Sequence, residues 1–240
     1  ESIDRRSLAS VFFPLNISSS ASDESCLRSS TTLVRIREGL PSSYCTYLSL
    51  GDSIVHVTQK GKLLCKKFYF CGTYMRDYMC VHRDRDLEVI LEKTLDSGDN
   101  IWVIGDIHGY FLTLKKLISK LNLGENDKII SLGDLIDRGP DSSSVLQLFH
   151  DDSMFHFIRG NHEDMMINCL RQNKDNFWES WFRKGGLQTM ESFGKRWEEQ
   201  IEDWCYFLST SPSEIVLKKY RLIHAGVNPL KSLDDQNEED

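Results

Sequence analysis

Short apolar runs and amphipathic stretches alternate along residues 100–172. Three brief apolar runs, each followed by glycine and a polar residue, are typical of buried strands: IWVI (101–104), KIISLGD (128–134) and FHFIRGN (155–161). Between and after them lie stretches with apolar residues at helical spacing, namely residues 110–122, 141–149 and 163–172. Asp141 or Ser142 is expected to cap the second of these helices. Strand and helix alternating three times predict an α/β fold with a parallel sheet.

The pattern before residue 99 is different. Residues 1–45 are rich in serine and lack periodicity, which is typical of a disordered or weakly ordered segment. Residues 46–98 hold two strand-like pieces and a helix-like one: SIVHV (53–57), KKFYF (66–70) and DLEVILEKTL (86–95). The charge differs as well, with 13 Lys and Arg against 12 Asp and Glu up to residue 98, and 16 against 24 afterwards. We predict an N-terminal extension over 1–98 without catalytic groups, and one domain over 99–240.

The composition narrows the class of protein. Hydrophobic residues make up 40% of the chain, which is enough for a core, and the net charge of −7 gives no reason to expect a nucleic-acid partner. No apolar run approaches the ~18–20 residues that span a membrane. The seven cysteines are odd in number and form no C-x-x-C pair. They therefore predict reduced thiols and a cytoplasmic location rather than a disulfide framework or a zinc ribbon.

Polar residues follow every predicted strand, including a fourth strand within KYRLIHAG (219–226). The four strand ends read GDIHG, GDLIDRG, GNHE and HAG. Any one of them alone could be an ordinary turn, since Asp and Gly are common turn residues. In open α/β sheets, however, the carboxyl ends of the strands share one rim, where ligands bind. The four ends together predict one cluster, composed of Asp106, His108, Asp134, Asp137, Arg138, Asn161, His162 and His224.

The residue types in this cluster indicate the chemistry. Carboxylate oxygens, imidazole nitrogens and an amide oxygen suit Mn, Fe or Zn rather than Ca or Mg. Several ligands with more than one carboxylate favour a pair of divalent ions roughly 3.5–4 Å apart, which activates water for in-line displacement at phosphorus. Arg138 fits such a reaction, because a guanidinium group can bind a phosphate bidentately, with two parallel hydrogen bonds to two of its oxygens.

The motifs GD-x-HG, GD-x-x-DRG, GNHE and HAG, in this order, resemble the metal-dependent serine/threonine phosphoprotein phosphatases of the calcineurin-like metallophosphoesterase family. WFRKGGLQT (181–189) is similar to the small bacterial and bacteriophage type. The resemblance covers residues 99–240 and implies a four-layer α/β/β/α sandwich with metals at its edge. It also implies hydrolysis of phosphomonoesters, chiefly phosphoserine and phosphothreonine in proteins, by a metal-bound hydroxide and without a covalent phosphoenzyme.

Carried over residue by residue, the resemblance implies a ligand set for two divalent metal ions. Asp106 and His108 would bind the first ion, and Asp134 would bridge both. Asn161 and His224 would bind the second ion. Mn²⁺ is the expected metal, with Fe and Zn as alternatives.

The resemblance also implies catalytic and substrate-binding roles. His162 would be the general acid that protonates the leaving alkoxide, oriented and charged by Asp137. Arg138, with Asn161, would bind the substrate phosphate. Glu163 would support the loop or a ligand rather than bind metal.

The chain departs from the family pattern after HAG. The family has one more metal-binding histidine, in a downstream Gly-His-Thr motif, and another phosphate-binding arginine between the two motifs. Neither precedes Asp240, the last residue. The domain is therefore expected to be incomplete at its C-terminus, with the second metal short of a ligand. His150 and His156 are expected to be structural or surface residues.

Two other functions stay open. A symmetrical diadenosine tetraphosphate hydrolase is similar in DRGP and HAGV, but that family has alanine in place of the aspartate of DRG, and GNHD in place of GNHE. Asp137 and Glu163 argue against it. The missing downstream ligands motivate the other reading, an inactive fragment that acts as a binding module.

Overall fold

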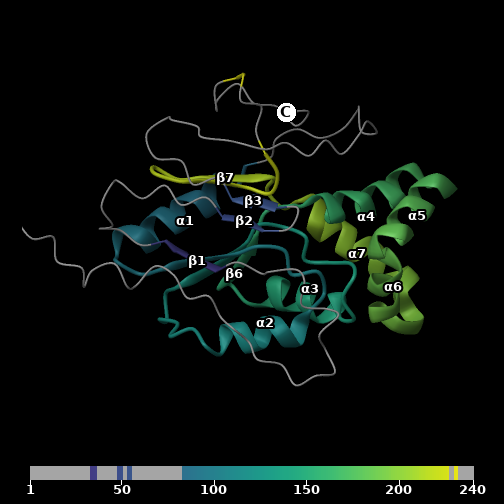
Figure 1. Cartoon of the computed structure of the whole chain (residues 1–240), viewed down its shortest axis with the longest axis horizontal. Coiled ribbons are helices and arrows are strands. Elements are labelled where there is room, and N and C mark those ends of the chain that lie inside the picture. The colour runs from purple at the N-terminus through teal and green to yellow at the C-terminus, as the bar shows by residue number, and fades with distance from the viewer. Residues whose placement is uncertain (1–32, 37–47, 51–52, 56–82, 227–229, 232–240) are drawn as a thin grey trace, which may run out of the picture.

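A computed structural model describes residues 33–36, 48–50, 53–55, 83–226 and 230–231 (Figure 1). The strands in this part of the chain are β1 (Leu33–Ile36), β2 (Leu48–Leu50), β3 (Ser53–Val55), β4 (Ile101–Ile104), β5 (Lys128–Ser131), β6 (Phe155–Phe157), β7 (Glu214–Val216) and β8 (Arg221–Ile223). The α-helices are α1 (Arg85–Asp96), α2 (Phe111–Ile118), α3 (Ser142–Asp151), α4 (Asn161–Gln172), α5 (Asp175–Trp181), α6 (Leu187–Phe193) and α7 (Trp197–Ser209). A π-helical turn, Phe182–Gly186, joins α5 to α6.

The main sheet has the strand order β1-β4-β5-β6. β4 pairs parallel with β5, and β5 pairs parallel with β6, so the predicted parallel α/β sheet is confirmed. The last residue of β4, Ile104, lies opposite Ser131, and Ser131 lies opposite Phe157. The three strands therefore end level with one another, and the loops that follow them leave from the same edge of the sheet.

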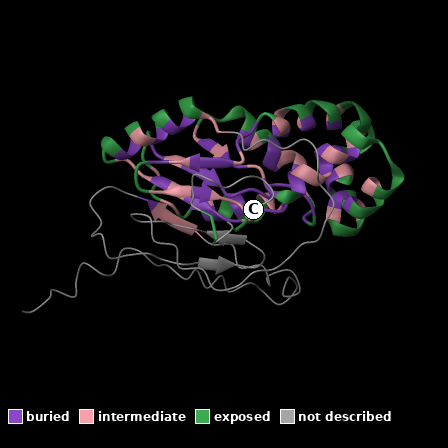
Figure 2. Cartoon of the chain, turned by 90° about the horizontal axis from the view of Figure 1, so that it is seen from above, coloured by how far each residue is buried: buried purple, intermediate pink, exposed green. Residues whose placement is uncertain are grey.

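Both faces of this sheet are buried. Successive side chains of a strand point to opposite sides, so each strand contributes residues to two separate cores. On one face Ile104, Ile129 and Phe155 join a core with α2, α3, α4 and α7. On the other face Ile101 and Ile130 join a second core with α1, β7 and β8. Figure 1 shows α2 and α3 on the opposite side of the sheet from α1 and β7. In Figure 2 the buried residues follow the strands, whereas exposed residues line the outer helix surfaces.

Side-chain caps begin two of the helices. The Asp84 carboxylate accepts the Leu87 N–H at 2.9 Å at the start of α1. At the start of α3 the Asp141 carboxylate accepts the Ser144 N–H at 3.1 Å, so Asp141 is the cap. Such caps satisfy N–H groups that have no partner within the helix. No described helix is both long and apolar enough to cross a bilayer.

β8 and β1 differ from the expectation, and β2 and β7 were not predicted from the sequence. The predicted fourth strand, β8, does not extend the parallel sheet but forms an antiparallel hairpin with β7. The physical reason is the short connection, since four residues can close a hairpin whereas a parallel pair needs a long crossover. The second difference is β1, which pairs antiparallel with β4 although its segment showed no periodicity in the sequence. Of the other strand-like pieces, SIVHV contains β3, and KKFYF lies outside the described residues.

Candidate active site

The loops after β4, β5 and β6 carry the predicted cluster, and they turn sharply. Four residues other than glycine in them have positive φ: His108 (49°), Asp134 (51°), Asp137 (73°) and Arg138 (67°). Left-handed backbone at residues other than glycine costs about 1–3 kcal/mol each and persists where the surrounding structure holds it, often at functional sites. Gly160 allows the loops to meet, because a Cβ there would lie 2.4 Å from Asp134 Oδ1.

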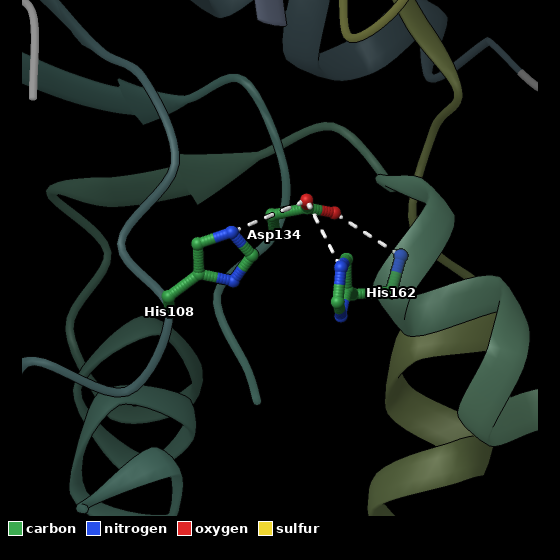
Figure 3. Close-up of side chains that lie close together, drawn as sticks. All are labelled: His108, Asp134 and His162. Carbon is green, nitrogen blue, oxygen red and sulfur yellow. Dashed lines mark hydrogen bonds and ion pairs between the residues drawn. The ribbon is translucent and has the colours of Figure 1, made fainter. Parts of the chain in front are cut away.

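Asp134 lies at the centre of the cluster. Its Oδ2 is 3.6 Å from His108 Nε2 and 3.9 Å from His162 Nε2. Its Oδ1 accepts the His162 backbone N–H at 3.1 Å and lies 3.5 Å from His224 Nε2. Figure 3 shows the Asp134 carboxylate between the His108 and His162 rings. One carboxylate therefore faces imidazoles from three separate segments, which is the position required of a bridging ligand.

His108 and His224 are held in the same way. Each has its Nδ1 against a backbone carbonyl, His108 at 2.9 Å from Ile136 O and His224 at 2.7 Å from Leu132 O. We assign Nδ1–H as the donor in both, because a carbonyl can only accept. The Nε2 atoms of the two rings then lie near the Asp134 carboxylate, at 3.6 Å from Oδ2 and 3.5 Å from Oδ1. This is the usual arrangement of a histidine that binds a metal.

The cluster changes the pKa of both imidazoles. Burial lowers the pKa of His108 below its usual value, although the Asp134 carboxylate opposes this effect. Burial alone would also lower the pKa of His224, but the carboxylates of Asp134, Asp106 and Glu163 together raise it. Excess negative charge around Asp134 is what a pair of divalent cations would neutralise.

Two groups of donor atoms in the described residues could each hold an ion. One consists of His108, Asp134 and His162, and the other of Asp106, Asp134 and His224, with the donor atoms of each within 4.8 Å of one another. Asp134 belongs to both, as the predicted bridge requires. Asn161 lies beside the second group, since its Oδ1 is 2.9 Å from His224 Nε2. The carboxylate, imidazole and amide donors fit two ions of the Mn, Fe or Zn type.

His162 differs from the other two imidazoles in its partner. Its Nδ1 lies 2.6 Å from Asp137 Oδ2, and both side chains are fully buried, with exposures of 1% and 0%. Arg138 is exposed and donates from Nη2 to His162 Nε2 at 3.0 Å and from Nη1 to His108 Nε2 at 2.8 Å. A carboxylate-supported imidazole next to an exposed guanidinium matches the predicted general acid and phosphate binder in position. The roles themselves stay predictions.

Glu163 supports the β5 loop from the first turn of α4. Its Oε2 accepts the N–H groups of Asp134 (2.9 Å) and Gly160 (2.8 Å), and its Oε1 accepts that of Leu135 (2.8 Å). Burial, then repulsion from Asp134, raises the pKa of Glu163 to about 7. Its carboxylate binds backbone amides, in agreement with the supporting position expected from the sequence.

We expect Glu163→Gln to destabilise the protein by up to roughly 3 kcal/mol, less than the lost hydrogen bonds alone would cost, because the substitution also removes a buried charge whose pKa is raised. Whichever oxygen becomes an NH₂ group would face backbone N–H donors, and each buried N–H left without an acceptor costs about 1–3 kcal/mol. Urea unfolding of the metal-free chain above pH 7 would measure the change. The matched control is Glu199→Gln, since Glu199 is an exposed partner of Arg196 and should matter little. Equal effects of the two substitutions would contradict the assignment.

Two residues to which the sequence analysis gave no role also contact the site. Trp181 and Thr189 both donate to the Asp137 carboxylate, from Nε1 at 2.8 Å and from Oγ1 at 2.7 Å. They begin and end the WFRKGGLQT segment. The similarity of this segment to the bacterial phosphatases was the one feature of the sequence that pointed to these two residues. It assigned no role to either side chain.

Comparison with known proteins agrees with this geometry. Residues 100–240, more than half of the chain, match the model of the calcineurin-like phosphoesterase family. A serine/threonine-protein phosphatase 1 of Salmonella typhimurium is 40% identical over 80 residues, which are 33% of this chain and 37% of that protein.

Tetraphosphatases are also among the similar proteins. An asymmetrical bis(5'-nucleosyl)-tetraphosphatase of Oceanobacillus iheyensis is 29% identical over 144 residues, covering 52% of this chain and 55% of that protein. A symmetrical one of Shewanella baltica is 32% identical over 148 residues, covering 58% of this chain and 48% of that protein. The matched part of this chain thus spans little more than half of these relatives at most. From the family match, together with the strand-end motifs and the paired donor groups around Asp134, we conclude that the chain belongs to the calcineurin-like phosphoesterases.

Proposed function

We propose that this protein hydrolyses phosphomonoesters in a metal-dependent reaction, with phosphoserine and phosphothreonine in proteins as its substrates. The observation that carries the proposal is the buried His162–Asp137 pair beside Asp134, with the Arg138 guanidinium exposed next to it. A proton donor matters most when the leaving group is a basic alkoxide, as in phosphoserine, because an alkoxide cannot depart readily without a proton.

In this proposal each residue has a separate task. Two divalent ions, with Mn²⁺ as the expected metal, would polarise the phosphoryl group and activate water when bound by Asp106, His108, Asp134, Asn161 and His224. Arg138, with Asn161, binds the phosphate oxygens and turns the ester toward His162. Once Arg138 binds the phosphate instead of His162 Nε2, a His162 ring protonated at both nitrogens transfers its Nε2 proton to the leaving oxygen, and Asp137 stabilises that imidazolium through Nδ1.

The substrate setting is part of the same proposal. We expect a phosphorylated protein or peptide as the partner, rather than nucleic acid or a membrane, because the net charge is −7. A cytoplasmic location is supported by Cys169 and Cys205, which are free and buried in the core.

A diadenosine tetraphosphate hydrolase is the second candidate. The similarity to the two tetraphosphatases favours it. Asp137 weighs against it, because the resemblance implies alanine at this position in the symmetrical enzymes. In this chain Asp137 Oδ2 instead lies 2.6 Å from Nδ1 of His162, the proposed general acid.

Turnover of two substrates by the Mn²⁺-loaded chain would decide between these functions. We expect phosphate release from a phosphoserine peptide with a kcat/KM at least ~10-fold above that for diadenosine tetraphosphate, a ratio equal to about 1.4 kcal/mol of transition-state binding. Asp134→Asn is the control for contaminating activity. The opposite preference would support the tetraphosphatase, and metal binding without turnover of either substrate would support the binding module.

A further inference from the structure

The segment from Trp181 to Thr189 reaches Asp137 from a distant part of the chain, 44 and 52 residues along the sequence. It ends α5, passes through the π-helical turn and begins α6. Both end residues are completely buried, at 0% exposure. Trp181 and Thr189 are therefore fixed parts of the core whose polar atoms face the site.

Together with His162, these two residues satisfy the Asp137 carboxylate on every side. Oδ1 accepts from Thr189 Oγ1 at 2.7 Å and from Trp181 Nε1 at 3.0 Å, while Oδ2 accepts from Trp181 Nε1 at 2.8 Å. The other contact of Oδ2 is His162 Nδ1 at 2.6 Å. A carboxylate without solvent contact needs such donors, because an unpaired buried charge is very costly. With one face taken by the indole and the hydroxyl, the carboxylate can present Oδ2 to the imidazole in one orientation.

The same segment holds the backbone of the DRG turn. Thr189 Oγ1 accepts the Asp137 N–H at 2.9 Å, and the Gly185 carbonyl accepts the Arg138 N–H at 3.1 Å. Asp137 and Arg138 are consecutive non-glycine residues with left-handed backbone, and each has a backbone hydrogen bond to this segment. Gly185 is required for the contact, since its φ is 111° and a Cβ would lie 2.6 Å from Arg138 N.

We propose that Trp181 and Thr189 are positioning residues, which fix the Asp137 carboxylate and, through it, the His162 ring and its Nδ1 proton. They touch neither substrate nor metal, and they act through Asp137. The proposal rests on the proposed function only where it takes His162 as the general acid and Asp137 as its support. The arrangement itself can be tested in the metal-free chain.

The first test is the NMR signal of the His162 Nδ1 proton in the metal-free chain, assigned by its loss in His162→Asn. In the wild type we expect a downfield resonance protected from exchange by the 2.6 Å bond. Thr189→Val keeps the shape but removes the hydroxyl, and should speed exchange of this proton about 10-fold or more, the effect of losing one bond to a charged group. Thr189→Ser should restore slow exchange, because it returns the donor.

The matched control is Thr94→Val. Thr94 is also a buried threonine, and its hydroxyl bonds the Ile90 carbonyl in α1, away from the site. It should alter stability without changing the His162 signal. If Thr189→Val does not fold, Trp181→Phe removes the other donor, with Trp178→Phe as its control. No change beyond the controls, or no restoration by Thr189→Ser, would overturn the proposal.

The second test separates this proposal from the proposed function. In the Mn²⁺-loaded chain, Thr189→Val should lower kcat for a phosphoserine peptide about 10-fold, with KM and p-nitrophenyl phosphate turnover little changed. A protein that hydrolyses no phosphoserine, yet shows the Thr189-dependent His162 signal, would refute the proposed function and keep the positioning role. Equal losses for both substrates would overturn the route through His162.

Discussion

His162→Asn is expected to cut the turnover of a phosphoserine peptide by ~10²–10⁴-fold, the usual contribution of a general acid. The turnover of p-nitrophenyl phosphate should fall much less, because nitrophenolate departs without a proton. The ratio of the two losses, measured on the Mn²⁺-loaded protein, is the decisive quantity. Asp137→Asn should show the same bias more weakly, since Asp137 only supports the imidazolium from 2.6 Å.

Two controls make this result interpretable. His150→Asn makes the same substitution at an exposed histidine, which packs against Trp204 and Phe207, and should leave both activities unchanged. Metal content should stay near normal in His162→Asn, although Nε2 lies 3.9 Å from Asp134 Oδ2 and belongs to one of the donor groups. Loss of a metal, or equal slowing of both substrates, would make His162 a ligand or a phosphate binder and refute its assignment as the acid.

Asp134→Asn is expected to weaken Mn²⁺ binding by ~10²-fold or more, beyond the 10–100-fold typical of losing a residue that only supports a ligand. Asp134 is common to both donor groups, so the substitution removes the negative charge that they share and replaces one of the two carboxylate oxygens by an NH₂ group, which cannot bind a metal. Calorimetric titration of the purified chain with Mn²⁺ would measure the affinity and the number of ions bound. His108→Asn should weaken binding less, because His108 belongs to one group alone.

The control for charge is Asp203→Asn, which removes an exposed carboxylate on α7 and should leave binding unchanged. The metal-free Asp134→Asn variant should stay folded, because the Asp134 charge repels Glu163 and raises its pKa. Unaltered Mn²⁺ binding in a folded Asp134→Asn variant would be incompatible with the metal centre described above.

The sequence by itself determined the parallel strands and the residues at their ends. Apolar runs such as IWVI are short, and Gly-Asp follows directly, so the pattern indicates both the strand and its exit. The carboxyl ends of parallel strands lie at one edge of the sheet. The sequence alone therefore predicted that Asp106, Asp134 and Asn161 lie close together. These inferences depend on local patterning and on a general rule of topology.

Only the tertiary structure decided which of these side chains contact one another, and from where the others come. His224 reaches Asp134 from the β7–β8 hairpin rather than from the parallel sheet. Trp181 and Thr189 reach Asp137 across 44 and 52 residues, from helices that the strand pattern did not predict. Hydrophobic periodicity records which face of an element is buried, but not its neighbour. Hydrogen bonds between distant side chains arise when whole elements pack together, so they could not be predicted from the chain alone.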